Sequence, residues 1–273
     1  MTSTLNFNVF NAPEKPVVGD RPKALGAPMA WDPMSSTLIY GDHDAVLVDP
    51  LTTVDEAEAL AAWVKLHHRN LTTIYITHGH LDHYAGVSIM QRHFPDARAI
   101  ATSKAVEFAH TQSPAAYRKM FPGQMPASIT LPEPYDQPFF ELEGHELCII
   151  EQGRTDAPDT TSLYVPDLGL IVTGDVVYNQ CHQFVAQITP ESLDNWFSAL
   201  DRLADLNPTT VVAGHKKPGV PDTPECIAWT KQYLRDFDRL RGETASDSEL
   251  YEAMIGLYPD RAGRQSWLLF GLA

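Results

Sequence analysis

Short apolar runs that end in polar residues recur along the chain, and each of them predicts a buried β-strand. They are rich in β-branched and aromatic side chains, which favour strands. The runs cover residues 36–40, 45–49, 72–77, 99–101, 159–165, 170–175 and 210–215. The first two lie on either side of Gly41-Asp42, a pair typical of turns, which predicts a hairpin.

Helical patterns separate these runs. A capping-box sequence, Thr-Val-Asp-Glu, opens a predicted helix over residues 53–69. A second helix is predicted over residues 84–94, and a third, with Pro in its first turn and one apolar face, over 189–206. Two more begin near residues 223 and 246. Strands in hairpins with helices between them predict two layered sheets covered by helices.

Composition narrows the class of protein. A chain of 273 residues with 44% apolar content fits one large domain, or a domain with a small appendage. The formal net charge of −15 argues against nucleic acid as a substrate. The first residues lack the basic start and apolar run of a signal peptide, and no stretch approaches about 18 uncharged apolar residues. We therefore expect a cytoplasmic protein without a membrane partner.

The hexad His-Gly-His-Leu-Asp-His at residues 78–83 holds four metal-competent side chains in six positions, directly after a predicted strand. His78 and His80 alternate and so point the same way from an extended backbone, whereas Asp82 and His83 follow the turn. Imidazole and carboxylate together suit zinc first, and iron or manganese next. The hexad therefore predicts a centre for one or two metal ions.

This pattern resembles the HxHxDH signature of the metallo-β-lactamase superfamily. The resemblance implies further ligands where later strands end, and two are found: Asp175 closes a Thr-Gly-Asp turn and His215 closes a Gly-His turn. The implied ligands are His78 and His80 for a first ion, Asp82, His83 and His215 for a second ion, and Asp175 as a bridge between them.

The resemblance also implies the fold. It covers about residues 36–215 and implies an α/β protein, an αββα sandwich of two mixed sheets flanked by helices with the metals at one edge. We interpret residues 1–273 as a single domain of this kind, with residues 216–273 as a helical C-terminal extension. Such motifs identify the superfamily but not the substrate.

One ligand position departs from the pattern, because Arg154 stands where the resemblance implies a His. A guanidinium stays protonated and has no lone pair for a metal. Three interpretations remain open: one ion in the second site, with His78 and His80 as hydrogen-bonding or acid–base groups; two weakly held ions, with Asp156, Asp159 or His182 filling the gap; or an altered site with little activity.

The leading functional hypothesis is a hydrolase that opens a lactone or cleaves a carboxylic ester by a metal-bound hydroxide. Asp82 would orient the water and help transfer its proton. Tyr178, three residues after Asp175 as in acyl-homoserine lactonases, would donate to the oxyanion. Arg154 and His182 are candidate substrate-binding residues; the alternatives are a salt bridge for Arg154 and loop packing for His182.

Two other functions remain open. One is a thioester hydrolase of the glyoxalase II type, for which Lys216 and Lys217 are the available basic residues. The other is a non-catalytic binding protein with a degraded metal site, which Arg154 favours. In either case the expected partner is a small molecule, and the C-terminal helices leave a homodimer as one alternative to plain packing.

Two smaller questions concern the surroundings of the centre. The six prolines of residues 111–138 exclude a long regular element and predict loops over the site. The apolar side chains of this segment either line a substrate wall or pack against the scaffold: Tyr117, Met120, Phe121 and Met125. Asp49, at a strand end, either orients a ligand His or caps the turn before Pro50.

Overall fold

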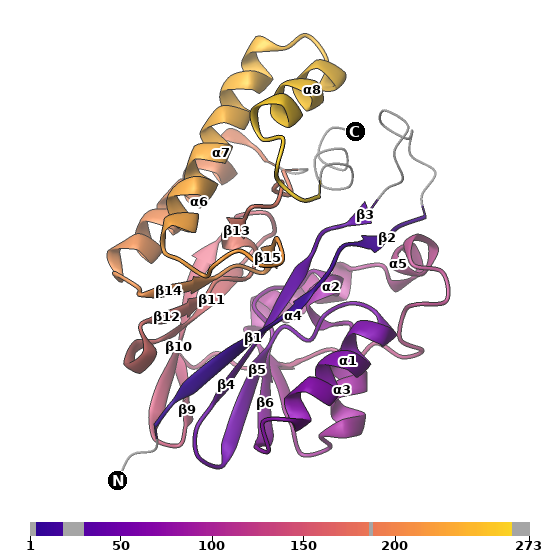
Figure 1. Ribbon diagram of the computed structural model, residues 1–273, viewed down its shortest axis with the longest axis vertical. Coiled ribbons are helices and arrows are strands. Elements are labelled where there is room, and N and C mark those ends of the chain that lie inside the picture. Colours follow the sequence, from indigo (N-terminus) through magenta and orange to yellow (C-terminus); the bar gives the residue numbers. More distant parts are fainter. Residues whose placement is uncertain (1–3, 19–29, 186–187, 264–273) are drawn as a thin grey trace.

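The computed structural model describes residues 4–18, 30–185 and 188–263, and its core is a pair of layered mixed sheets (Figure 1). The larger sheet has the order β13-β15-β4-β5-β6-β7-β8, with β1 also paired to β4. Its strands are β1 (Asn6–Ala12), β4 (Met34–Tyr40), β5 (Asp44–Val48), β6 (Asn70–Tyr75), β7 (Arg98–Ala101), β8 (Glu133–Pro134), β13 (Tyr178–Asn179) and β15 (His215–Lys216).

The smaller sheet has the order β14-β12-β11-β10-β9. Its strands are β9 (Phe139–Leu142), β10 (His145–Gly153), β11 (Thr160–Val165), β12 (Leu170–Val172) and β14 (Thr210–Val212). A separate short pair joins β2 (Lys15–Pro16) and β3 (Ala30–Trp31). Both sheets mix directions: β4–β5 is antiparallel and β5–β6 parallel in one, and β11–β12 antiparallel and β12–β14 parallel in the other.

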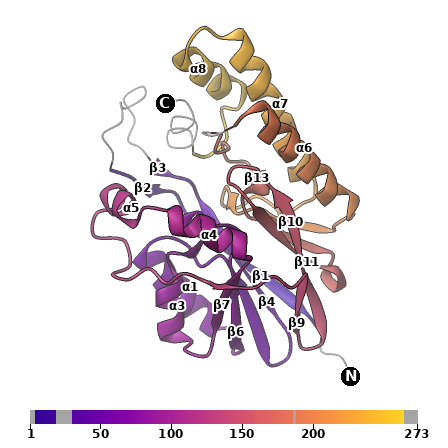
Figure 2. The same ribbon diagram turned by 180° about the vertical axis from the view of Figure 1, so that it is seen from behind.

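Helices cover the outer faces of the two sheets (Figures 1 and 2). On the side of the larger sheet are α1 (Val54–Lys65), α2 (Leu81–Tyr84), α3 (Val87–His93), α4 (Ser103–Thr111) and α5 (Pro114–Met120). On the side of the smaller sheet are α6 (Pro190–Asp205), α7 (Glu225–Glu243) and α8 (Asp247–Leu257). This arrangement confirms the predicted sandwich of two mixed sheets flanked by helices.

Three apolar clusters correspond to the three interfaces between these layers. Between the sheets, Val46 and Tyr75 of the larger sheet share a cluster with Ile149 and Leu163 of the smaller one. A second cluster joins the larger sheet to α1, α3 and α4, and a third joins the smaller sheet to α6, α7 and α8. Central strands with both faces buried explain the continuous apolar runs of the sequence.

Two segments differ in detail from the sequence expectation. The helix predicted over residues 84–94 is divided into α2 and α3 at Gly86, where a Cβ would lie 2.0 Å from the carbonyl oxygen of Pro50. Only Gly allows this close approach of α3 to the chain. The Pro-rich segment holds no long element, as predicted, but contains the short α5 with Pro114 in its first turn.

Within the parts of the chain that the structure describes, no helix combines the length and apolar character needed to cross a bilayer.

Candidate metal centre

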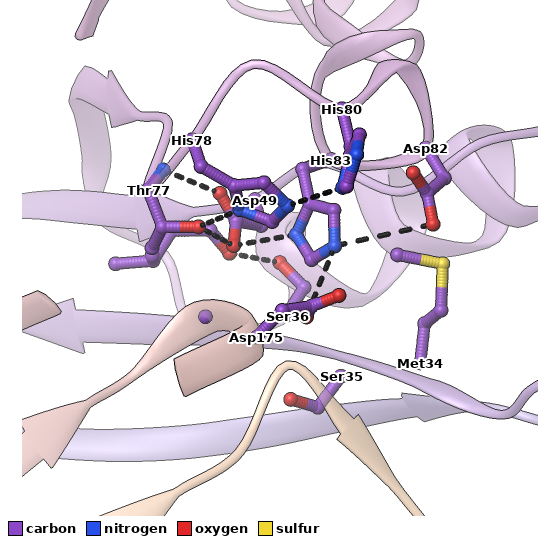
Figure 3. Close-up of polar contacts among 12 residues, drawn as sticks. Met34, Ser35, Ser36, Asp49, Thr77, His78, His80, Asp82, His83 and Asp175 are labelled. Carbon is purple, nitrogen blue, oxygen red and sulfur yellow. Dashed lines mark hydrogen bonds and ion pairs between the residues drawn. The ribbon is translucent and has the colours of Figure 1, made fainter. Parts of the chain in front are cut away.

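The predicted metal-binding residues converge where strands of the two sheets end. His78 and His80 lie in the loop after β6, and Asp82 and His83 form the first turn of α2 (Figure 3). Asp175 belongs to a 3₁₀ turn, Gly174–Val176, that follows β12. His215 begins β15 after Gly214, where a Cβ would lie 2.5 Å from Asp175 Oδ1, so the absent side chain leaves room for the carboxylate.

A first group of donors consists of His78, His80, Asp156 and Asp175, with one ligand atom from each within 4.8 Å of the others. His78 Nε2 lies 3.1 Å from His80 Nδ1. Asp156 Oδ2 lies 3.1 Å from His80 Nδ1 and 3.7 Å from His78 Nε2. Donors at 2.0–2.1 Å from one tetrahedral ion stand about 3.3 Å apart, so this spacing fits a zinc-sized cation.

A second group consists of Asp82, His83 and His215, also within 4.8 Å. Asp82 Oδ2 lies 3.6 Å from His215 Nε2 and 3.9 Å from His83 Nε2. Asp175 reaches this group as well, because its Oδ1 is 3.2 Å from His83 Nε2 and its Oδ2 is 3.3 Å from His215 Nε2. Its carboxylate therefore lies between the two groups.

Three of the imidazoles are oriented through their other ring nitrogen. His83 Nδ1 lies 2.9 Å from Asp49 Oδ2, His215 Nδ1 lies 3.2 Å from the carbonyl of Pro33, and His78 Nδ1 lies 3.1 Å from Thr77 Oγ1. Figure 3 shows the His83 ring between Asp49 on one side and Asp82 and Asp175 on the other. Such partners fix the ring orientation of metal-binding histidines. Of the two roles predicted for Asp49, the structure shows the contact that orients a ligand histidine, His83.

The charges in this buried space are strongly coupled. Burial lowers the pKa of His215, but the Asp175 and Asp82 carboxylates outweigh it and raise that pKa to about 10. Burial raises the pKa of Asp82, but His83 and His215 outweigh it and bring it below its ordinary value. Burial and the nearby His83 lower the pKa of His78 to about 4. A cation that binds at His215 must therefore displace a proton from that imidazole, whereas His78 is already neutral near pH 7.

Several donor atoms of the centre lack a well-formed hydrogen bond that a bound cation would replace. Asp156 Oδ2, Asp175 Oδ1 and His83 Nε2 are buried; among the described residues they make no well-formed hydrogen bond and lie only at ion-pair distances from one another and from His80. Buried polar atoms without partners are costly and rare in folded proteins. A divalent cation would satisfy all three, and oxygen and imidazole donors are ligands that zinc, iron and manganese accept.

Of the three residues considered for the gap left by Arg154, only Asp156 lies with His78 and His80. Asp159 is 43% exposed in its side chain, with Oδ1 3.9 Å from Lys104 Nζ. His182 is buried with its Nδ1 2.9 Å from the hydroxyl of Tyr233 in α7.

Arg154 and Tyr178 occupy contrasting positions. Arg154 is exposed, and its backbone carbonyl accepts a hydrogen bond from the Asn195 side chain. Tyr178 is fully buried; its hydroxyl donates to Asp175 Oδ2 at 3.0 Å, and its ring stacks on His215. The substrate roles of Arg154, His182 and Tyr178 stay predictions.

Two aromatic residues hold Asp82. The indole N–H of Trp31 donates to its Oδ2 at 3.3 Å, and the hydroxyl of Tyr117, from α5, donates to its Oδ1 at 3.4 Å. Phe121 and Met125 are instead buried in the core cluster around α1 and α3. Tyr117 was predicted only to line a substrate wall or to pack against the scaffold. Trp31 was not predicted, because its Pro- and Gly-rich surroundings give no periodic signal.

The centre is most accessible at His80, whose side chain is 13% exposed while those of His78, His83 and His215 are completely buried. Two partly buried rings flank it: those of Phe108 and Phe184 lie with their centroids 5.5 and 5.7 Å from the His80 ring. Aromatic rings therefore flank the most exposed donor of the centre.

Solved structures share the fold. A metallo-beta-lactamase family protein from Thermus thermophilus superposes with a TM-score of 0.65 at 18% identity, covering 97% of this chain and 91% of that one. A metallo-beta-lactamase from Pontibacter korlensis gives 0.62 at 18% identity, covering 85% and 99%. At such identity these likenesses describe the fold alone.

Sequence relatives are named hydroxyacylglutathione hydrolase. One from Vibrio cholerae serotype O1 is 29% identical over 238 residues, 83% of this chain and 77% of the relative. One from Glaesserella parasuis serovar 5 is 28% identical over 142 residues, 52% of this chain and only 49% of the relative. The profile of the Metallo-beta-lactamase superfamily matches residues 29–215, a span that contains all the converging donors, and the chain therefore belongs to this superfamily.

Proposed function

We propose that the protein is a metal-dependent hydrolase that opens a lactone or cleaves a carboxylic ester. The observation that carries this proposal is the convergence of two donor groups on either side of the Asp175 carboxylate. Membership of a superfamily of metallo-hydrolases supports hydrolysis as the reaction. Zinc is our first candidate for one or two ions, with manganese and iron as alternatives.

A cation held by these residues would lower the pKa of a water molecule and would stabilise negative charge on a carbonyl oxygen. Asp82 is ionised and its orientation is set by Trp31 and Tyr117, so it is suited to accept a hydrogen bond from a water and orient it. Burial and the neighbouring Asp175 raise the pKa of Tyr178, so the phenol keeps its proton. To serve a developing oxyanion, the hydroxyl would turn from Asp175 Oδ2, to which it donates in the structure.

The surroundings of His80 support an apolar acyl or ring group on the substrate. Phe108 and Phe184 flank the most accessible part of the centre, and aromatic faces contact apolar groups without loss of hydrogen bonds. Arg154, exposed at the end of β10, remains our candidate for a carboxylate or other anionic end of the substrate. His182 is the second candidate for a substrate contact.

A thioester hydrolase of the glyoxalase II type is the second candidate function, and the names of the sequence relatives favour it. The basic residues expected to hold the thiol carrier have other partners, however. Lys216 is buried and its ammonium lies 2.6 Å from Asp222 Oδ1, and the Lys217 ammonium donates to the carbonyl of Asp260. A lactone or ester therefore remains our first proposal.

A panel of lactones, aryl esters and S-lactoylglutathione tests both candidates. The protein is assayed after chelation and after reloading with zinc, manganese or iron. We expect turnover of a lactone or ester to disappear with the metal and to return with it. Turnover that survives chelation would contradict the proposal, and preference for the thioester would favour the second function. Inactivity of both the native protein and Arg154→His would favour a binding protein.

We further propose a small molecule as the partner, a cytoplasmic location and, as the alternative to a monomer, a homodimer. Size-exclusion chromatography with light scattering distinguishes the two oligomeric states, and cell fractionation checks the location.

A further inference from the structure

Position 154 does not contribute to the metal centre. The side chain of Arg154 is exposed, and its carbonyl is tied to Asn195 of α6 at 2.6 Å. The preceding strand β10 has a register shift between Glu151 and Gly153 against β11, so the chain leaves the sheet irregularly. A protonated guanidinium would in any case repel a cation.

Asp156, two residues further, occupies the space beside the two histidines. Its side chain is completely buried. Its Oδ1 accepts a hydrogen bond from Thr155 Oγ1 at 2.9 Å, which fixes the carboxylate, whereas Oδ2 has no hydrogen-bond partner among the described residues. The turn itself is held by the Thr155 N–H, which donates to the carbonyl of Ala157. Oδ2 lies instead at ion-pair distance from the two imidazoles, 3.7 Å from His78 Nε2 and 3.1 Å from His80 Nδ1.

We propose that Asp156 replaces the histidine expected at position 154 as a ligand of the first ion. Each group then offers two imidazoles and two carboxylates when Asp175 is shared: His78 and His80 with Asp156 in one, and His83 and His215 with Asp82 in the other. This inference rests on the same centre as the proposed function, but it concerns metal binding alone.

The exchange of imidazole for carboxylate changes the kind of ion that the first group prefers. Oxygen donors suit harder ions such as manganese, whereas imidazole suits zinc. The additional negative charge also offsets more of the charge of two dications in a buried space. Relative to a form with a third histidine, the first group is expected to bind manganese better in comparison with zinc.

Metal binding to three chains tests the proposal without any substrate. The native protein, Asp156→Asn and Asp159→Asn are loaded with cobalt or manganese, dialysed and measured by elemental analysis and metal titration. Asp159 is the matched control, because it lies in the same turn but at the surface. We expect two ions per chain in the native protein and in Asp159→Asn. In Asp156→Asn we expect one ion per chain. The affinity of the first group for its ion should fall about 100-fold, because loss of a ligand costs at least as much as loss of a supporting residue.

A second variant, Asp156→His, separates ligation from a structural role of the carboxylate. If Asp156 is a ligand, Asp156→His restores two ions and shifts the affinity ratio of the first group toward zinc. If the Asp156 carboxylate only stabilises the turn, Asp156→Asn and Asp156→His both lack that contact and neither binds an ion at the first group. That result would overturn the proposal. Two ions with unchanged affinities in Asp156→Asn, or one ion in the native protein at saturating metal, would overturn it too. Failure to hydrolyse any substrate would leave these counts unchanged.

Discussion

At the scale of single residues, Asp49 combines an unusual backbone with a central position at the metal centre. Its φ of 56° lies in the left-handed region, which Asp and Asn tolerate better than most residues. In this conformation its carboxylate accepts hydrogen bonds from the N–H and hydroxyl of Thr77 and contacts His83 Nδ1. The conformation thus directs the other nitrogen of His83 toward the second group.

Asp49→Asn is therefore expected to weaken the second ion by about 10–100-fold, the usual cost of losing a residue that orients a ligand. The substitution keeps the size of the side chain and the tolerated φ, so folding should be retained. Competition with a zinc-binding dye measures the affinity. Asp42→Asn, at an exposed position, is the control and should have no effect. Equal affinities in all three chains would show that Asp49 does not support His83.

Tyr178→Phe tests the proton donor at the reacting carbonyl. We expect kcat to fall about 100-fold, as for loss of one oxyanion donor, with little change in KM. Because the hydroxyl also donates to Asp175, metal content is measured in parallel. A normal kcat at saturating metal together with a weaker metal affinity would mean that Tyr178 only supports Asp175.

The residues of the centre differ in how far the sequence alone could identify them. Four lie within one hexad, and Asp175 and His215 each follow a Gly at the end of an apolar run, so a local pattern marks them. Asp156 was one of three candidates, and the choice depends on how the turn after β10 folds. Trp31 reaches Asp82 across 51 positions, a contact that no local pattern encodes.

At the scale of elements, the starts of α1 and α6 were well predicted because their signals are local. Thr53 accepts from the Glu56 N–H while the Glu56 side chain accepts from the Thr53 N–H, as the capping box predicts, and Thr189 and Ser192 form the same arrangement at α6. The short helices α4 and α5 were not predicted, because they lack a long apolar period. Tertiary contacts, including that of Tyr117 with Asp82, stabilise such short helices.

Loss of either cap should lower stability without a change in the metal centre. Thr53→Ala and Thr189→Ala are each expected to destabilise the protein by about 1 kcal/mol. Ser198→Ala, exposed in the middle of α6, is the matched control and should not lower stability, since Ala favours helix interiors. Denaturant unfolding measures the free energy, and zinc titration checks the centre. A cap variant as stable as the control would contradict the role of that box.

At the scale of the whole molecule, the metal centre joins parts of the chain that belong to different layers. Its donors come from the loop after β6, the first turn of α2, the turn after β10, the turn after β12 and the start of β15. The superfamily profile ends at residue 215, but α7 and α8 share an apolar cluster with α6 and the smaller sheet. They are therefore integral to the packing of this side of the molecule.

Removal of metal should destabilise the fold as a whole. The carboxylates of Asp82, Asp156 and Asp175 are buried at the junction of the layers, and a bound cation balances their charge. An ion at 1,000 times its Kd stabilises the folded state by about 4 kcal/mol. We therefore expect chelation to lower Tm by several degrees and zinc to restore it, as measured by differential scanning fluorimetry. An identical Tm with and without metal would mean that metal binding does not stabilise the folded state.

The difference in burial between His80 and the second group affects the order in which ions bind and dissociate. His80 belongs to the first group and is partly exposed, whereas Asp82, His83 and His215 of the second are at most 2% exposed. His80 is the most exposed of the donors, so we expect ions to enter and leave on its side. We therefore expect the outer ion to arrive last and depart first, and the inner ion to be trapped for as long as its neighbour stays.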